Sequence, residues 1–230
     1  GLLTKSDLAD RPDFPLERVN YGPVIDWKMK ITRKSFQRFQ SNKKAKLLKD
    51  FETFKQEESH WLEPFATFMA IKGQHGGVAW SEWSADLRKR DPKAMKAFKK
   101  KHAQEIEFHS YLQFIFYRQW HALRDYAADK GIRIIGDIPI FVAYDSADVW
   151  MHKELFYLDE EGLPEVVAGV PPDYFSETGQ LWGNPLYNWK AHKANGYQWW
   201  IDRMSAVLNQ VDIVRLDHFR GFEAYWEIPY

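Results

Sequence analysis

The 230-residue sequence contains no cysteine, which excludes disulfide bonds and thiolate metal sites. It also has no run approaching the ~20 apolar residues of a membrane span, and its N-terminus lacks a signal-peptide core. The chain therefore reads as the interior of a longer, cytoplasmic protein. Thirty-two basic residues balance thirty-two acidic ones, so nothing in the charge calls for nucleic acid or an acidic membrane as a partner.

Several ligand motifs are missing as well. The sequence has no G-x-G-x-x-G, no P-loop and no H-E-x-x-H. His102, Glu105 and His109 could share one face of a helix, but a solvated helix face is the simpler interpretation. We therefore expect neither a metal nor a cofactor. Among the histidines, His218 alone draws attention, because it follows an aspartate.

Aromatic residues are abundant, with eleven Trp, eleven Tyr and sixteen Phe. Most large aromatics fill cores, although such a supply also suits a surface that stacks on sugar rings. The breakers Pro12, Pro15, Gly22 and Pro23 predict an irregular segment over residues 1–31. Residues 32–130 have helical periodicity, with Phe36, Phe39, Leu47, Leu48, Phe51 and Phe54 on one side.

The last hundred residues, 131–230, alternate between strand and helix patterns. Asp91-Pro92 predicts a helix start, and Gly131 a helix end. Asp145 or Ser146 should cap a short helix, and Asn195 should cap a longer one that runs to about residue 209. Residues 156–171 should form a hairpin or an extended excursion around Glu161-Gly162. Residues 172–190 should be a loop.

Two apolar runs, 132–142 and 211–216, predict buried strands of the parallel type. The fold class is therefore α/β. Two strands cannot close a (β/α)₈ barrel, which needs eight.

Each strand carries an aspartate near its carboxyl end. Residues two apart in a strand point to the same side, so Arg215 can lie beside Asp217 and keep it ionised. A rigid carboxylate there suits a nucleophile, although a structural ion pair is the alternative. Asp137, on the other strand, should reach the same sheet edge, where parallel α/β folds place their active sites, or it could cap a loop.

The predicted loop combines aromatic rings with amide and carboxylate groups, which is how a sugar site is built. It could equally bury its own aromatics. The candidate residues are Asp173, Tyr174, Phe175, Gln180, Trp182, Asn184 and Tyr187.

Three blocks, GDIPIFVAYDSADVW, GVPPDYFSETGQLWGNPLYNW and VRLDHFRGFEAYWEIP, closely resemble the 4-α-glucanotransferases called amylomaltases or disproportionating enzymes. The resemblance implies a partial (β/α)₈ barrel, holding strands three and four, with an inserted helical subdomain. It implies transfer of α-1,4-glucan segments between maltooligosaccharides by a retaining mechanism. It implies that Asp217 is the nucleophile and that Arg215 orients it. Asp137 would line the same sugar subsite, and the glucan would be contacted by Tyr174, Phe175, Gln180 and Trp182. His218 and Arg220 would lie nearby.

One part of the family's pattern is missing. Retaining enzymes need a second carboxyl group as acid/base, and the family's A-E-D-L-G-like block does not occur here. We therefore expect an internal fragment that is inactive by itself. A non-catalytic α-glucan-binding module and a metal-dependent barrel hydrolase are the alternatives.

Overall fold

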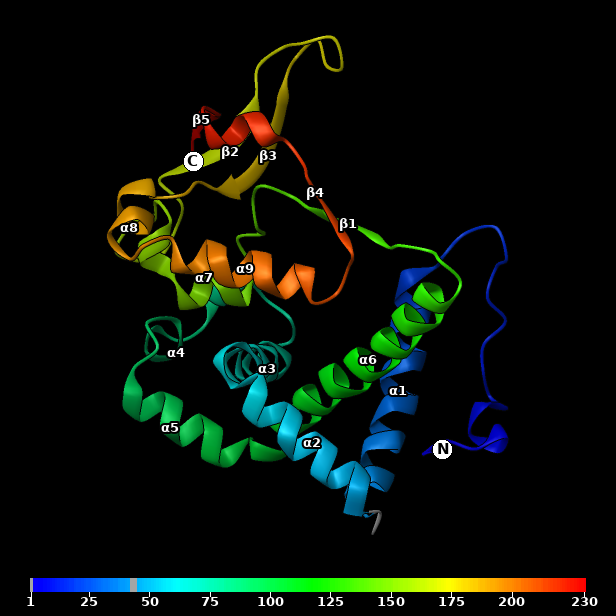
Figure 1. Cartoon of the computed structure of the whole chain (residues 1–230). Coiled ribbons are helices and arrows are strands. Elements are labelled where there is room, and N and C mark those ends of the chain that lie inside the picture. The colour runs from blue at the N-terminus through cyan, green and yellow to red at the C-terminus, as the bar shows by residue number, and fades with distance from the viewer. Residues whose placement is uncertain (1, 42–44) are drawn as a thin grey trace.

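The computed structural model describes residues 2–41 and 45–230, and this part of the chain has an α/β fold (Figure 1). The long helices gather at one end of the molecule and the strands at the other. The helices are α1 (Tyr21–Gln40), α2 (Ala45–Glu57), α3 (Ser59–Gln74), α4 (Ala85–Arg88), α5 (Pro92–Lys101), α6 (Ala103–Asp129), α7 (Ala147–Met151), α8 (Trp189–Ala194) and α9 (Gln198–Leu208). The 3₁₀ turns are η1 (Lys5–Leu8), η2 (Trp80–Glu82), η3 (Lys153–Leu155) and η4 (Phe219–Phe222). The strands are β1 (Ile135–Ile138), β2 (Val166–Val170), β3 (Gln180–Pro185), β4 (Ile213–Leu216) and β5 (Trp226–Pro229). No helix in these ranges is long and apolar enough to cross a bilayer.

Helices α1, α2 and α6 enclose an aromatic core, as the phenylalanine spacing predicts. A buried polar contact within it joins the hydroxyl groups of Ser35 and Tyr111, whose oxygens lie 2.6 Å apart. Leu47, Leu48 and Phe54 pack against this core from α2. The buried members are Phe36, Phe39, Phe51, Phe108, Tyr111 and Phe114.

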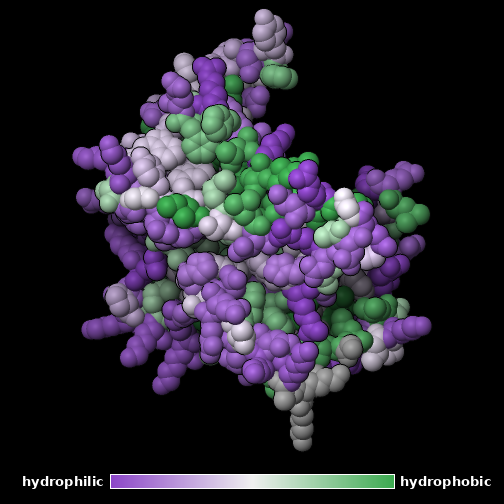
Figure 2. Space-filling view, in the orientation of Figure 1, coloured by the Kyte–Doolittle hydropathy of each residue, from purple (hydrophilic) through white to green (hydrophobic). Residues whose placement is uncertain are grey.

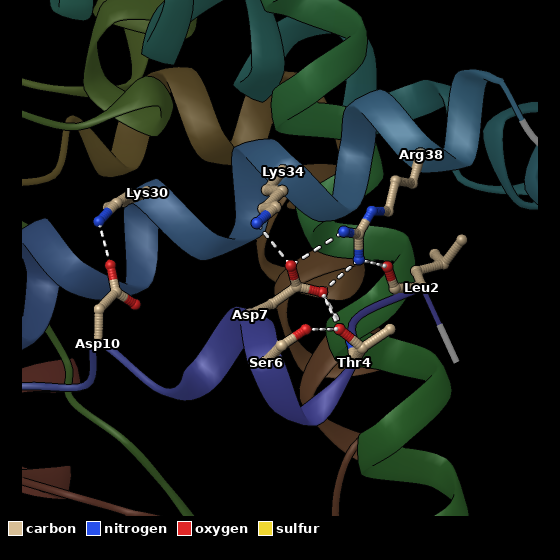
Figure 3. A network of polar contacts seen from close by, with 8 residues as sticks. All are labelled: Leu2, Thr4, Ser6, Asp7, Asp10, Lys30, Lys34 and Arg38. Atoms are coloured by element: carbon tan, nitrogen blue, oxygen red, sulfur yellow. Dashed lines mark hydrogen bonds and ion pairs between the residues drawn. The ribbon is translucent and has the colours of Figure 1, made fainter.

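The N-terminal segment docks on α1 through a buried carboxylate (Figure 3). Asp7 accepts hydrogen bonds from Arg38 and from the backbone N–H of Thr4, and it also pairs with Lys34. The Arg38 guanidinium, then Lys34 and Thr4, hold the pKa of Asp7 well below its usual range. The segment is thus tied to the helix by charge.

The prediction that residues 1–31 are irregular is wrong in its last third, because α1 begins at Tyr21. Pro23 falls in the first turn, where a helix does not use the backbone N–H that proline lacks. A proline that reads as a breaker is therefore compatible with a helix start.

Three predicted helix boundaries are confirmed. The side chain of Asp91 accepts from the backbone N–H groups of Lys93 and Ala94 at the start of α5. Ser146 caps α7. Gly131 follows α6 with a φ of 69°.

The prediction for Asn195 is wrong. Asn195 ends α8, whose N-cap is Asn188, and α9 begins after Tyr197. The residue after Asn195 is Gly196, with a φ of 69°, the left-handed conformation that commonly ends a helix. The Asn-Gly pair therefore closes one helix rather than opening the next.

Strands β1 and β4 form a parallel pair in which Asp137 lies opposite Arg215. The parallel pairing is as predicted, but the predicted burial is wrong: Ile135 is 65% exposed, whereas Ile138 is 2% exposed. In the part of the chain that the structure describes, these two strands make up the whole sheet. Figure 2 accordingly shows an apolar surface where Figure 1 places them.

A second, antiparallel sheet has the order β3-β2-β5. It corrects the prediction of a loop over residues 172–190, because residues 180–185 pair with β2 as a strand. The turn of this β2–β3 hairpin ends at Gly179, with a φ of 74°. The expected excursion around Glu161-Gly162 is confirmed as a tight turn closed by a Leu158–Pro164 bridge.

The larger core lies between the helices and this sheet. Tyr187 is at its centre, with the rings of Phe141, Phe156 and Trp199 within 6 Å between centroids. Much of the aromatic content is therefore used for packing. The largest fully buried aromatic side chains of this core are Trp80, Trp150 and Tyr187.

Candidate active site

Asp137 and Asp217 reach the same edge of the parallel pair, as the sequence predicts. Asp217 follows the last residue of β4, and its backbone N–H donates to the carbonyl oxygen of Ile138 at 3.0 Å. Its side chain is 57% exposed, so the carboxylate stands in solvent rather than in a core. The cost of burying a charge does not arise here, and an accessible carboxylate is free to meet a ligand.

Arg215 lies between the two aspartates but holds one of them far more closely. Its Nε and Nη2 donate to the two carboxylate oxygens of Asp137 at 2.9 and 2.6 Å. The distance from Nη2 to Oδ1 of Asp217 is 3.6 Å. The bidentate pair holds the pKa of the Asp137 carboxyl below its usual value and raises the pKa of Arg215. Arg215 therefore presents a fixed positive charge beside Asp217.

His218 connects this edge to the second sheet. Its backbone is in the left-handed region, with a φ of 50°, and it starts the turn η4. Its ring lies edge to face with that of Trp182 on β3, at 5.1 Å between centroids. The indole N–H of Trp182 in turn donates to the side-chain oxygen of Gln180 at 2.9 Å. The structure thus brings Trp182, Gln180 and His218 into one group next to Asp217.

The remaining candidates lie at the tip of the β2–β3 hairpin, which projects away from the body of the molecule (Figure 1). Tyr174 and Phe175 are almost fully exposed, at 106% and 91%. Asp173 accepts from the backbone N–H groups of Phe175 and Ser176, so its carboxylate shapes the turn. Within the described residues, no hydrogen bond or ring contact joins these three side chains to Asp217.

Two residues of the predicted sugar loop are structural. The side-chain amide of Asn184 donates to the carbonyl of Val142 at 2.9 Å, and the Tyr187 hydroxyl donates to that of Ile140 at 2.6 Å. Sequence reasoning missed Arg203, whose guanidinium donates to the carbonyls of Pro139 and Ile140. In the sequence, Arg203 looks like any arginine on the solvated face of a helix, so no sequence signal identifies its role.

The helix face considered above as a possible metal site carries an ion pair with Arg33 instead. Glu105 receives two hydrogen bonds from Arg33, at 2.9 and 2.6 Å, and lies 3.4 Å from Nε2 of His109. Burial lowers the pKa of His109. Over residues 2–41 and 45–230, no group of three His, Asp or Glu side chains is arranged to hold a metal ion.

The comparisons with known proteins agree over the whole chain. A family model described as 4-alpha-glucanotransferase matches residues 1–230. A 4-alpha-glucanotransferase from Thermus thermophilus is 53% identical over 218 residues, which are 95% of this chain and 44% of that protein. A chloroplastic or amyloplastic 4-alpha-glucanotransferase from Solanum tuberosum is 41% identical over all of this chain and 40% of its own length.

A solved structure agrees closely with the fold. The amylomaltase from Streptococcus agalactiae, in complex with acarbose, superposes with a TM-score of 0.92 at 40% identity, over 99% of this chain and 46% of that one. The chain thus spans less than half the length of these relatives. Because the family model matches every residue and the relatives align over nearly the whole chain, the chain belongs to the 4-alpha-glucanotransferase family.

Proposed function

We propose that this chain is part of a longer enzyme that transfers α-1,4-glucan segments between maltooligosaccharides with retention of configuration. Membership of the family supports the reaction class. The observation that carries the assignment of the site is the row formed by Asp137, Arg215 and Asp217, with an exposed carboxylate beside a fixed cation.

In the first proposed step, an oxygen of Asp217 attacks the anomeric carbon of the donor glucan. The glycosidic bond breaks, a carboxylic acid supplied by another part of the enzyme protonates the leaving oxygen, and a β-glucosyl ester forms on Asp217. In the second step, the 4-hydroxyl of an acceptor glucan gives its proton to that same group and displaces Asp217. A bound acceptor that excludes water favours transfer over hydrolysis.

Arg215 and Asp137 have different proposed roles. Arg215 keeps the Asp217 carboxylate ionised and oriented, while its bidentate bond to Asp137 fixes the guanidinium in place. The exposed carboxylate of Asp137 lines the same sugar subsite and accepts from sugar hydroxyls. Trp182, Gln180 and His218 bound the subsite, and Tyr174 and Phe175 fold over the glucan from the hairpin tip.

We also propose that β1 and β4 are the third and fourth strands of a (β/α)₈ barrel, and that residues 32–130 form an inserted helical subdomain. Direct parallel pairing of the two strands supports the first proposal. We keep the cytoplasm as the proposed location for this protein, although the name of the potato relative places that protein in plastids.

The test is Asp217→Asn in the full-length enzyme. It should lower the redistribution of maltotriose by on the order of 10⁴-fold, because losing a nucleophile removes the covalent path. Asp202→Asn, the same change on the exposed face of α9, is the matched control and should retain activity. Retained turnover in the Asp217→Asn variant would refute the role. The 230-residue chain alone should not disproportionate maltotriose, because it lacks the acid/base carboxyl.

A second candidate, a non-catalytic α-glucan-binding module, is favoured by the exposed rings of Tyr174 and Phe175. It predicts maltotetraose binding that survives Asp217→Asn and Arg215→Met but is lost in Tyr174→Ala. Calorimetric titration of these variants, with calcium and zinc in parallel, separates it from the transferase and from a metal-dependent hydrolase.

A further inference from the structure

The turn after Asp217 sits so close to the segment after β1 that position 221 has room for a hydrogen only. A Cβ atom built on Gly221 would lie 2.6 Å from Cδ1 of Ile140 and 2.8 Å from Cδ2 of His218. Non-bonded carbons prefer about 3.5–4.0 Å. The φ of Gly221 is not in the left-handed region, so the constraint is one of space and not of backbone conformation.

Ile140 is held firmly on its own side of this contact. It is 3% exposed, and its carbonyl oxygen accepts from the Tyr187 hydroxyl at 2.6 Å and from Nη1 of Arg203 at 3.1 Å. The Arg203 guanidinium lies over the rings of Trp199 and Trp200, at 5.3 and 5.0 Å from their centroids. The backbone of Ile140 is therefore fixed by these hydrogen bonds, and its Cδ1 atom, packed in the core, has little room to turn away from position 221.

The turn is held on its other sides as well. The backbone N–H of Gly221 donates to the carbonyl of His218 at 2.8 Å, and the His218 ring contacts Trp182. Phe222 packs on Trp200, at 5.1 Å between centroids. A side chain at position 221 must consequently displace the stretch that begins with Asp217.

We propose that Gly221 is a positioning residue for Asp217. Its missing side chain lets η4 rest on Ile140, and that contact sets where Asp217 stands relative to Asp137 and Arg215. The hydrogen bonds from Tyr187 and Arg203 to the Ile140 carbonyl keep that side of the contact fixed. The inference rests on the proposed role of Asp217 as nucleophile. It explains why position 221, which is not one of the reacting groups, is a glycine.

The first test is Gly221→Ala in the full-length enzyme. Restoring a normal carbon contact requires a shift of about 1 Å, and a misplacement of that size lowers rates by ~10²-fold. We expect kcat to fall by about that factor and KM to change much less, since Asp137, Gln180 and Trp182 stay in place and His218 alone of the proposed glucan-binding groups lies in the displaced turn. Gly73→Ala is the matched control, because nothing lies within 4 Å of that position in α3. It should leave kcat unchanged.

The second test is rescue. Ile140→Val deletes the Cδ1 atom that blocks position 221, and the half-exposed His218 ring can then turn aside. The double variant, compared with Ile140→Val alone, should lose much less kcat than Gly221→Ala loses from the parent, a recovery of about tenfold out of ~10²-fold. Thermal unfolding confirms that each variant is folded. If Gly221→Ala does not fold, the comparison of the double variant with Ile140→Val still decides.

The outcomes separate the two proposals. Full kcat in Gly221→Ala, or the same loss with and without Cδ1 at position 140, would overturn the positioning role. Retained turnover in Asp217→Asn would instead overturn the proposed function, whatever Gly221→Ala does.

Discussion

The indole of Trp182 lies edge to face with the imidazole of His218, with 5.1 Å between ring centroids. This contact joins the β2–β3 hairpin to the residue that follows Asp217. Trp182 also lies 6.2 Å from the ring of Phe141, in the segment after β1. The hairpin is thus anchored at its base to both strand ends that carry the aspartates, while its tip stays exposed.

Replacing Trp182 by alanine should weaken glucan binding more than it slows the chemistry. The variant loses an aromatic surface beside the proposed subsite, and aromatic contacts contribute about 0.5–1.5 kcal/mol beyond area burial. We expect KM for maltotriose to rise by about tenfold with a smaller change in kcat, because the hydrogen bonds of Asp137 and Arg215 do not involve the indole. Steady-state kinetics of the full-length enzyme measures both constants.

Leu181→Ala is the control for this prediction. Leu181 precedes Trp182 on β3 and is 70% exposed, and neighbours in a strand point to opposite faces. It should leave KM near the parent value. An equal rise of KM in both variants would mean that the hairpin as a whole, and not the Trp182 ring, matters.

Much of the local structure was predictable because local chemistry decides it. Asp91 and Ser146 cap helices through bonds to N–H groups two or three residues away, so the signal is complete within a few residues. The parallel pairing of β1 and β4 likewise follows from two apolar runs separated by helices. The common edge for Asp137 and Asp217 follows from that pairing.

The predictions that the structure corrects concern features that depend on contacts between segments far apart in the sequence. That Arg215 bonds Asp137 more closely than Asp217 is set by the strand register, which places residues 137 and 215 side by side. The strand over residues 180–185 forms by pairing with β2, a distant partner. The proline and glycine residues of this segment favour the prediction of a loop. Leu123 and Tyr126 of α6 belong to the helical periodicity predicted for residues 32–130, yet they are 53% and 62% exposed, because periodicity does not say where a neighbouring helix ends.

Protonation of His192 should destabilise the fold as the pH falls. His192 is fully buried, and the rings of Tyr187, Trp189 and Trp199 surround it. Burial lowers its pKa in the folded chain, while the unfolded chain takes up the proton near pH 6.5. The unfolded state therefore binds more protons below that pH, and the free energy of unfolding decreases from about pH 6.5 downward.

Urea unfolding of the 230-residue chain between pH 7.5 and pH 5, a range around the ordinary histidine value of ~6.5, tests this expectation. His192→Phe removes the titrating group and should flatten the decrease. It will not abolish the decrease, because burial also lowers the pKa of His109. His60→Gln, at an exposed position, should keep the full decrease. If the free energy of unfolding of His192→Phe fell as much as that of the parent over this pH range, the buried imidazole would not be the cause of the decrease.

Replacing Asp7 by asparagine should release the N-terminal segment from α1. In the parent, the low pKa of Asp7, caused first by Arg38, means that the carboxylate stabilises docking above its ordinary pKa of ~3.9 and loses this effect as the pH falls further. The amide carries no charge, so Arg38 and Lys34 keep two positive charges without their shared partner (Figure 3). Hydrogen exchange at η1 should become faster at neutral pH while exchange in α6 stays slow.

The control is Asp10→Asn, which breaks only an exposed pair with Lys30. It should change the exchange little, because exposed ion pairs contribute little to stability. Equal protection of η1 in the two variants would show that apolar contacts of Leu2, and not the buried charge, hold the segment in place.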